Sequence, residues 1–97
     1  MYTVNYQYEL NIDFTTFLNN SQAQNFIETV SSIVGIDPDD HYLSFIKQGS
    51  TIVGGTLSAA SLSSANSIQS VLGITIPGFT VLSTSSSVYY GKGPYVP

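Results

Sequence analysis

The sequence predicts an α+β domain with the element order β-α-β-β-α-β, and three observations lead to that prediction. Apolar and polar residues alternate without a break from Tyr2 to Phe14. Two later stretches space their apolar residues as helices do, and both end in a Gly-Ile step, Val34-Gly35-Ile36 and Leu72-Gly73-Ile74. Between them, two β-prone runs are joined by Gln48-Gly49-Ser50. We therefore expect a four-stranded antiparallel sheet with both helices on one face.

The alternation from Tyr2 to Phe14 indicates one long amphipathic strand. Its even-numbered residues should cover the helices, and its odd-numbered positions, with their Asn, Gln, Glu and Asp residues, should face solvent. Strands of five or six residues are usual, so part of this one is expected to project beyond its neighbours.

The first helix is predicted from about Ser21 to Val34, where the apolar residues follow the helical period. Ser21 and Gln24 are placed as a capping box, and Gly35 is placed as the C-terminal stop. The matching endings at Gly35 and Gly73 imply two similar half-units.

The second half is predicted as a hairpin, a helix and a strand. Residues 41–47 and 51–57 form the hairpin, and 36–40 are a turn rich in carboxylates. The second helix is expected to begin within 58–64 and to end at Gly73, with Leu62, Ala65, Ile68, Val71 and Leu72 on its apolar side. A last strand is expected at 79–83. This order is the split β-α-β, or ferredoxin-like, arrangement, which makes 1–83 one domain and 84–97 a Ser/Tyr/Gly/Pro-rich tail or linker.

Composition limits the classes of function. A chain of 97 residues forms one domain with one core. Only 8% of the residues are charged, the net charge is −4, and the two cations are Lys47 and Lys92, so nucleic-acid binding is not expected. A neutral Ser/Thr/Asn/Tyr surface is typical of extracellular and cell-surface proteins. There is no cysteine, no stretch long enough for membrane insertion and no secretory signal pattern, which leaves a cytoplasmic protein or a mature or excised domain.

Gly49-Ser50-Thr51-Ile52-Val53 resembles the Gly-Ser-Val-Val-Val motif of SEA and SEA-like domains, which are extracellular modules with this order of elements. The likeness covers roughly residues 4–83, and Thr51 departs from the motif. In cleaving members a strained turn lets the serine attack the preceding carbonyl. The resemblance therefore implies Gly49 as the acyl group and Ser50 as the nucleophile. The simpler interpretation is that Gly49-Ser50 only forms the hairpin turn.

Other chemistry has little support in the sequence. His41 is the only histidine and lies beside Asp37, Asp39 and Asp40, without the second histidine or cysteine that a transition-metal site needs. The acidic run is expected to cap the turn, with a weak Ca²⁺ site as the alternative. A serine hydrolase would need a Gly-x-Ser-x-Gly elbow, and an acylphosphatase would need an arginine. The chain has neither, so we predict no catalysis by these routes, no metal and no cofactor.

Tyrosines are the predicted interaction residues. The period-two placement of Tyr6 and Tyr8, and that of Tyr42, favours the core or its edge, whereas four others are candidates for docking onto a partner. These four are Tyr2, Tyr89, Tyr90 and Tyr95. Asn19 begins the glycosylation sequon Asn-Asn-Ser before the first predicted helix, where it should be exposed.

Three functions remain open from the sequence. The first is a structural or interaction module, such as a filament or surface-layer subunit that joins copies of itself, or other extracellular proteins, by strand or tail exchange. The second is an autoproteolytic SEA-like module that is cleaved between Gly49 and Ser50. The third is a small glycan-binding domain that uses exposed Tyr and Asn on the open sheet face.

Overall fold

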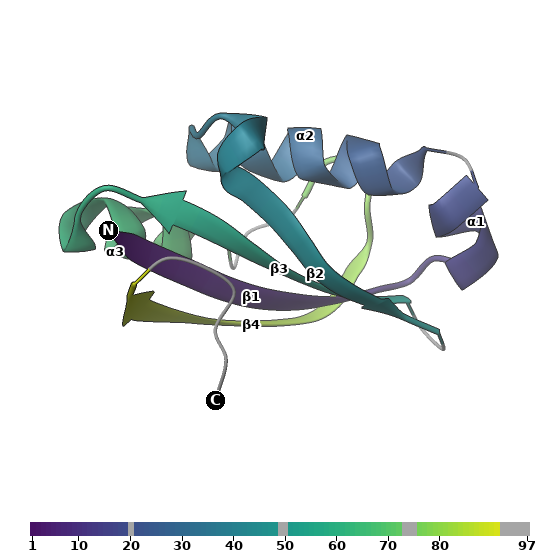
Figure 1. Cartoon of the computed structure of the whole chain (residues 1–97). Coiled ribbons are helices and arrows are strands. Elements are labelled where there is room, and N and C mark those ends of the chain that lie inside the picture. Colours follow the sequence, from purple (N-terminus) through teal and green to yellow (C-terminus); the bar gives the residue numbers. More distant parts are fainter. Residues whose placement is uncertain (20, 49–50, 73–75, 92–97) are drawn as a thin grey trace.

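A computed structural model describes residues 1–19, 21–48, 51–72 and 76–91 of the chain. It has the predicted α+β architecture, with helices on one side of a single antiparallel sheet (Figure 1). The elements in chain order are β1 (Tyr2–Leu10), α1 (Phe14–Asn19), α2 (Gln22–Val34), the 3₁₀ turn η1 (Pro38–Asp40), β2 (His41–Lys47), β3 (Thr51–Ala59), α3 (Leu62–Val71) and β4 (Val81–Tyr90).

The strand order is β2-β3-β1-β4, with antiparallel pairing throughout. Each helical connection therefore joins two strands that have a third strand between them, which is the split β-α-β arrangement predicted from the sequence. β1 is central and pairs along its whole length with β3 on one side and β4 on the other. The expectation that β1 projects beyond its neighbours is therefore wrong.

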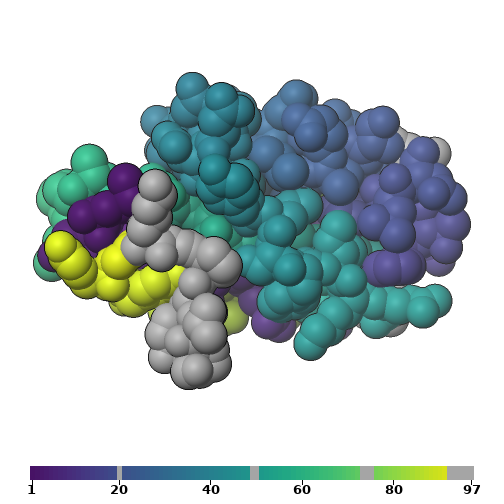
Figure 2. Space-filling view, viewed as in Figure 1, coloured from purple at the N-terminus to yellow at the C-terminus, as the bar shows by residue number. Residues whose placement is uncertain are grey.

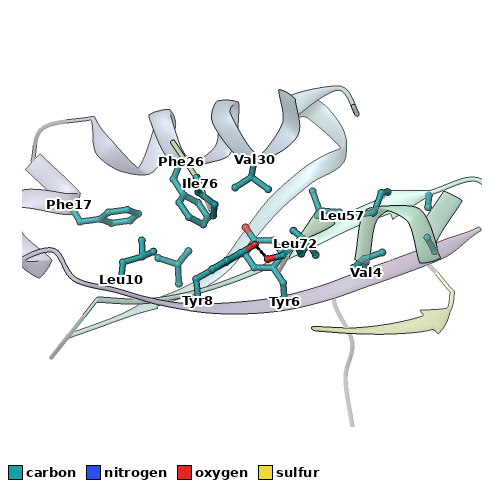
Figure 3. Close-up of a cluster of buried hydrophobic side chains, with 14 residues drawn as sticks. Val4, Tyr6, Tyr8, Leu10, Phe17, Phe26, Val30, Leu57, Leu72 and Ile76 are labelled. Atoms are coloured by element: carbon teal, nitrogen blue, oxygen red, sulfur yellow. Dashed lines mark hydrogen bonds between the residues drawn. The ribbon is translucent and has the colours of Figure 1, made fainter. Parts of the chain in front are cut away.

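The core lies between the helices and the even-numbered face of β1, as the alternation predicts. Val4, Tyr6, Tyr8 and Leu10 are all buried and point toward the helices (Figure 3). Tyr8 buries its ring and donates a hydrogen bond from its hydroxyl to the carbonyl of Leu72, just after α3.

Aromatic rings fill the middle of the core. Phe26 on α2 is fully buried and contacts Tyr8, Phe17 and Phe79 edge-on, with ring centroids 5.4–6.2 Å apart. Such edge-to-face pairs stabilise a core beyond the burial of their area. Since Phe17 lies in α1 and Phe79 in the loop before β4, this cluster also holds that helix and that loop against the core.

Two further predictions for β1 are wrong. The strand ends at Leu10, and Phe14 begins a short helix, α1, that the alternation did not predict. Asp13 explains the change, because its carboxylate accepts a hydrogen bond from the backbone N–H of Thr16 and so caps the new helix. Thr3, an odd-numbered residue expected to face solvent, is 1% exposed and donates a hydrogen bond to the carbonyl of Gly91.

The prediction for α2 is right at its end and wrong at its cap. Gly35 ends the helix with a φ of 78°, a conformation that glycine adopts without strain, and its N–H bonds the carbonyl of Ser31. Ser21 has a φ of 56° and makes no side-chain cap, so the predicted capping box does not form. Gln24 instead donates to the carboxylate of Glu28, at 3.4 Å.

The hairpin strands β2 and β3 form as predicted, but β3 is longer, and α3 begins at Leu62, within the expected range. Ser58 and Ala59, expected near the helix start, are the last residues of β3. α3 begins after Ser61, whose hydroxyl accepts a hydrogen bond from the N–H of Ser64 at 3.1 Å. Leu62, placed on the apolar side from the sequence, is 48% exposed.

The largest correction concerns β4. The predicted strand at 79–83 and tail from residue 84 are replaced by one strand, Val81–Tyr90, that pairs with β1 over its length. The Thr-Ser-Ser-Ser run has no apolar alternation because most side chains of this outer strand are exposed on both faces. Backbone hydrogen bonds to β1 hold this strand in the sheet, and the pattern of side chains along the sequence does not indicate such bonds.

Candidate functional site: the outer strand β4 and the open sheet face

The tyrosine candidates lie in three different settings. Tyr2 and Tyr90 are opposite each other on β1 and β4, with their rings edge-on and centroids 5.2 Å apart. Figure 2 shows the purple start of the chain beside the yellow end of β4. Tyr90 is 74% exposed. Tyr89 is half-buried opposite Thr3, and Tyr95 lies outside the described residues.

The end of β4 is fastened to the start of β1. The N–H of Gly91 donates to the carbonyl of Met1 at 3.0 Å, and the carbonyl of Gly91 accepts from the hydroxyl of Thr3 at 2.7 Å. Tyr89 and Tyr90 therefore belong to the folded sheet, and the prediction that they sit in a tail is wrong.

β4 forms one edge of the sheet. Its register with β1 shifts between Glu9 and Leu10, at the start of the strand, and beyond that shift it carries no feature that would keep another strand away. Val81-Leu82-Ser83-Thr84-Ser85-Ser86-Ser87-Val88-Tyr89-Tyr90 has no charge and no proline, and no described strand pairs with its outer side. Exposed edges without such features pair readily with another chain. One outer carbonyl is occupied, because Gln69 on α3 donates its amide to the carbonyl of Ser86 at 3.2 Å.

The other edge, β2, is better protected. Its register with β3 shifts between Leu43 and Phe45, which is a bulge-type irregularity. It also ends in Lys47, whose ammonium lies 5.0 Å from the centroid of the Phe45 ring. Bulges and lysines are the means by which natural sheets discourage edge pairing. The two edges therefore differ in how open they are to another strand.

A buried polar chain links β1, β2 and α2 through His41. Nε2 of His41 lies 2.5 Å from the hydroxyl of Tyr6, and Nδ1 lies 3.0 Å from the hydroxyl of Ser31. Ser31 donates to the carbonyl of Ile27 at 2.6 Å. Because that donation uses the serine proton, Nδ1 must carry the histidine proton, and Tyr6 must donate to Nε2.

The side chains of this polar chain are enclosed within the fold. Ser31 is 1% and His41 is 4% exposed, so no substrate reaches the pair in this conformation. Burial lowers the pKa of His41 to about 4, against a smaller opposing effect from the Ile27 carbonyl. Burial also raises the pKa of Tyr6, which keeps its hydroxyl protonated and able to donate. The sequence did not suggest this network, since Tyr6, Ser31 and His41 come together only through packing.

The acidic turn acts as predicted from its sequence. Asp37 precedes η1 and accepts a hydrogen bond from the N–H of Asp39 at 2.9 Å, so it caps the turn before β2. Within the described ranges, no group of three or more His, Cys, Asp or Glu residues gathers to hold a metal ion.

Gly49 and Ser50, to which the SEA resemblance assigns autoproteolysis and the simpler interpretation a hairpin turn, lie outside the described residues. The strands on either side of them are described, and Lys47 pairs with Ile52 at that end of the hairpin. Asn19, the sequon residue, is the last residue of α1, and its side chain is exposed, as the sequence predicts.

The sequence matches no protein-family model and no curated protein. Among the helices of the described segments, none is both long enough and apolar enough to cross a membrane.

Proposed function

We propose that this chain is a non-catalytic structural or interaction module of an extracellular or cell-surface assembly, and that it joins a second copy of itself through the outer edge of β4. The observation that carries the proposal is the exposed edge of a ten-residue strand without charge or proline. Backbone N–H and C=O groups along such an edge give affinity by strand addition, and the side chains set the register.

A second copy suits this edge better than an unlike strand. Because β4 is uncharged, two copies meet without like-charge repulsion, and its small serine side chains allow close approach. Pairing around a two-fold axis closes the contact and joins two four-stranded sheets into one. The bulge and Lys47 disfavour the same pairing at β2, so growth into a filament or surface layer requires a second contact elsewhere.

The composition supports an extracellular place for this module. Only 8% of residues are charged, and the exposed side chains of β4 and α3 are largely serine. The exposed Asn19 offers a site for a glycan on α1.

The test is the mass of the chain in solution over a range of concentrations, by light scattering and sedimentation. We expect a species of twice 10.4 kDa that dissociates on dilution. Leu82→Lys places a charge on β4 at a residue 52% exposed and should shift the equilibrium to monomer.

Leu62→Lys is the matched control, since Leu62 is 48% exposed but lies on α3. It adds the same charge and removes the same apolar surface, and the dimer should persist. Monomer at every concentration, or an equal effect of the two substitutions, would exclude β4 as the interface.

A further inference from the structure

The face of the sheet opposite the core carries a hollow of about 250 Å³. The strand register explains its position, because Phe45 on β2, Gly54 on β3, Gln7 on β1 and Ser85 on β4 lie in one row across all four strands. The next row holds Tyr42, Thr56, Asn5 and Ser87. The residues that line the hollow are Asn5, Tyr6, Gln7, Phe45, Ser85, Ser86 and Ser87.

Gly54 shapes one side of this hollow. A Cβ atom at this position would overlap the ring of Phe45, so the ring lies over the space that a side chain would occupy. Phe45 thereby turns part of its ring toward the middle of the sheet and stays 37% exposed. A glycine inside a strand often marks such a close approach. The Phe45 ring therefore forms an aromatic side of the hollow, next to a row of small and polar residues.

The polar groups of the hollow are available to a ligand. Asn5, Gln7, Ser85 and Ser87 make no side-chain hydrogen bond to other residues in the described part of the chain. Asn5 and Gln7 are two residues apart on one face of β1, which separates their side chains by about 7 Å. Each amide both donates and accepts, and so does each serine hydroxyl.

We propose that this hollow binds a neutral saccharide, with one sugar face on the Phe45 ring and hydroxyls bonded to Asn5, Gln7 and the serines of β4. Sugar hydroxyls donate and accept, which matches paired amides and hydroxyls. Sugar C–H groups pack on an aromatic face.

The charge of the hollow supports a neutral ligand. None of its lining residues is charged. The row on the other side of Gln7, away from Asn5, carries Glu9 and Lys47. Their opposite charges favour neither an anionic nor a cationic ligand. An apolar ligand would leave two amides and the serine hydroxyls without partners, which costs affinity.

The test is a titration of isotope-labelled full-length chain with maltose, lactose and N,N′-diacetylchitobiose, followed by NMR. We expect at least one sugar to shift the side-chain amide signals of Asn5 and Gln7 with saturation. Phe45→Ala should weaken that binding roughly three- to tenfold by removing the aromatic contact.

Tyr42→Ala is the matched control, because Tyr42 is an exposed aromatic of the same strand that does not line the hollow. The affinity of the Tyr42→Ala protein for the sugar should equal that of the wild type. An unchanged affinity in Phe45→Ala, or no saturable shifts with any of the three sugars, would overturn the proposal. Loss of self-association in Phe45→Ala without any sugar effect would also overturn it, by assigning this face to a second copy of the chain.

Discussion

The hydroxyl of Tyr6 lies 2.5 Å from Nε2 of His41, 35 positions away in the sequence. This bond joins the central strand to the first residue of β2, and Ser31 continues it into α2. A buried polar chain of this kind stabilises the fold only while each member keeps its proton in place.

Acid should therefore destabilise the fold through His41. Its pKa is 6.5 when unfolded and about 4 when folded, so only the unfolded chain takes up the proton between those values. The free energy of unfolding should fall by about 3 kcal/mol as the pH drops from 6.5 to 4, beyond the contribution of other groups. Urea unfolding across this range should show a smaller drop for His41→Gln. Equal slopes for the two proteins would contradict the prediction.

Adjacent glycines of β3 should differ in how much stability the chain loses when each is replaced by alanine. A Cβ at Gly55 would overlap the phenol of Tyr6, which is buried and held by His41, so Gly55→Ala should cost about 1–3 kcal/mol. A Cβ at Gly54 would overlap Phe45, whose exposed ring can swing away, so Gly54→Ala should stay within about 1 kcal/mol of wild type. Chemical denaturation compares them directly, and similar losses would show that Tyr6 is not held in place.

Gln69 should weaken self-association through β4. Its amide occupies the outer carbonyl of Ser86, so Gln69→Ala frees an acceptor for a partner strand. One hydrogen bond of this kind should tighten the dimer by roughly two- to tenfold, as measured by sedimentation. Asn66→Ala, an exposed change on the same helix, should leave the association constant unchanged. An unchanged constant in Gln69→Ala would argue against pairing at the middle of β4.

Asn19 should carry a glycan when the chain passes through a eukaryotic secretory pathway. Its side chain is exposed at the end of α1, where a glycosyltransferase can reach it. Expression with a secretory leader should give a slower band on a gel that an N-glycosidase converts to the unmodified size. The same treatment should not alter Asn19→Gln. A secreted chain without this band would show that the sequon is not used.

The proposed non-catalytic role predicts a single intact chain. Denaturing mass spectrometry of purified protein should give one species at 10.4 kDa after prolonged storage at neutral pH. Two fragments meeting between Gly49 and Ser50 would instead support the autoproteolytic SEA-like interpretation. In that case Ser50→Ala should restore the intact mass, because it removes the nucleophile.

The fold could be predicted where one side of an element is buried. The alternation of β1 identified its core face correctly, and Gly35 correctly marked the end of α2. The extent of β4 could not be predicted, because an outer strand exposed on both faces has no alternation and is held by its backbone. Likewise α1 was not predicted, because the alternation of apolar and polar residues continued to Phe14. The carboxylate of Asp13, which caps the helix, determines where α1 begins.

The candidate site was harder to predict than the fold. Tyr90 was identified as exposed and available, but for the wrong reason, since it lies in a strand. The hollow depends on Phe45, Gly54 and Gln7 falling in one row, which requires knowing the register of three strands. Two sequence signals pointed to this face, the polar odd-numbered residues of β1 and Gly54 within a β-prone run.

The central place of β1 also governs how the chain acquires its fold. Both neighbours of this first strand come from the second half of the sequence, and Thr3 bonds Gly91 across 88 positions. Contacts of such high sequence separation make folding slow, on the order of milliseconds or longer. During synthesis β1 leaves the ribosome long before β4. The backbone groups of β1 on the side of β4 therefore stay unpaired until that strand has been synthesised. A chain cut after Ser87 would lack Val88–Tyr90, the partners of Tyr2, Thr3 and Val4, and would expose one edge of the first part of the strand on which the whole sheet is built.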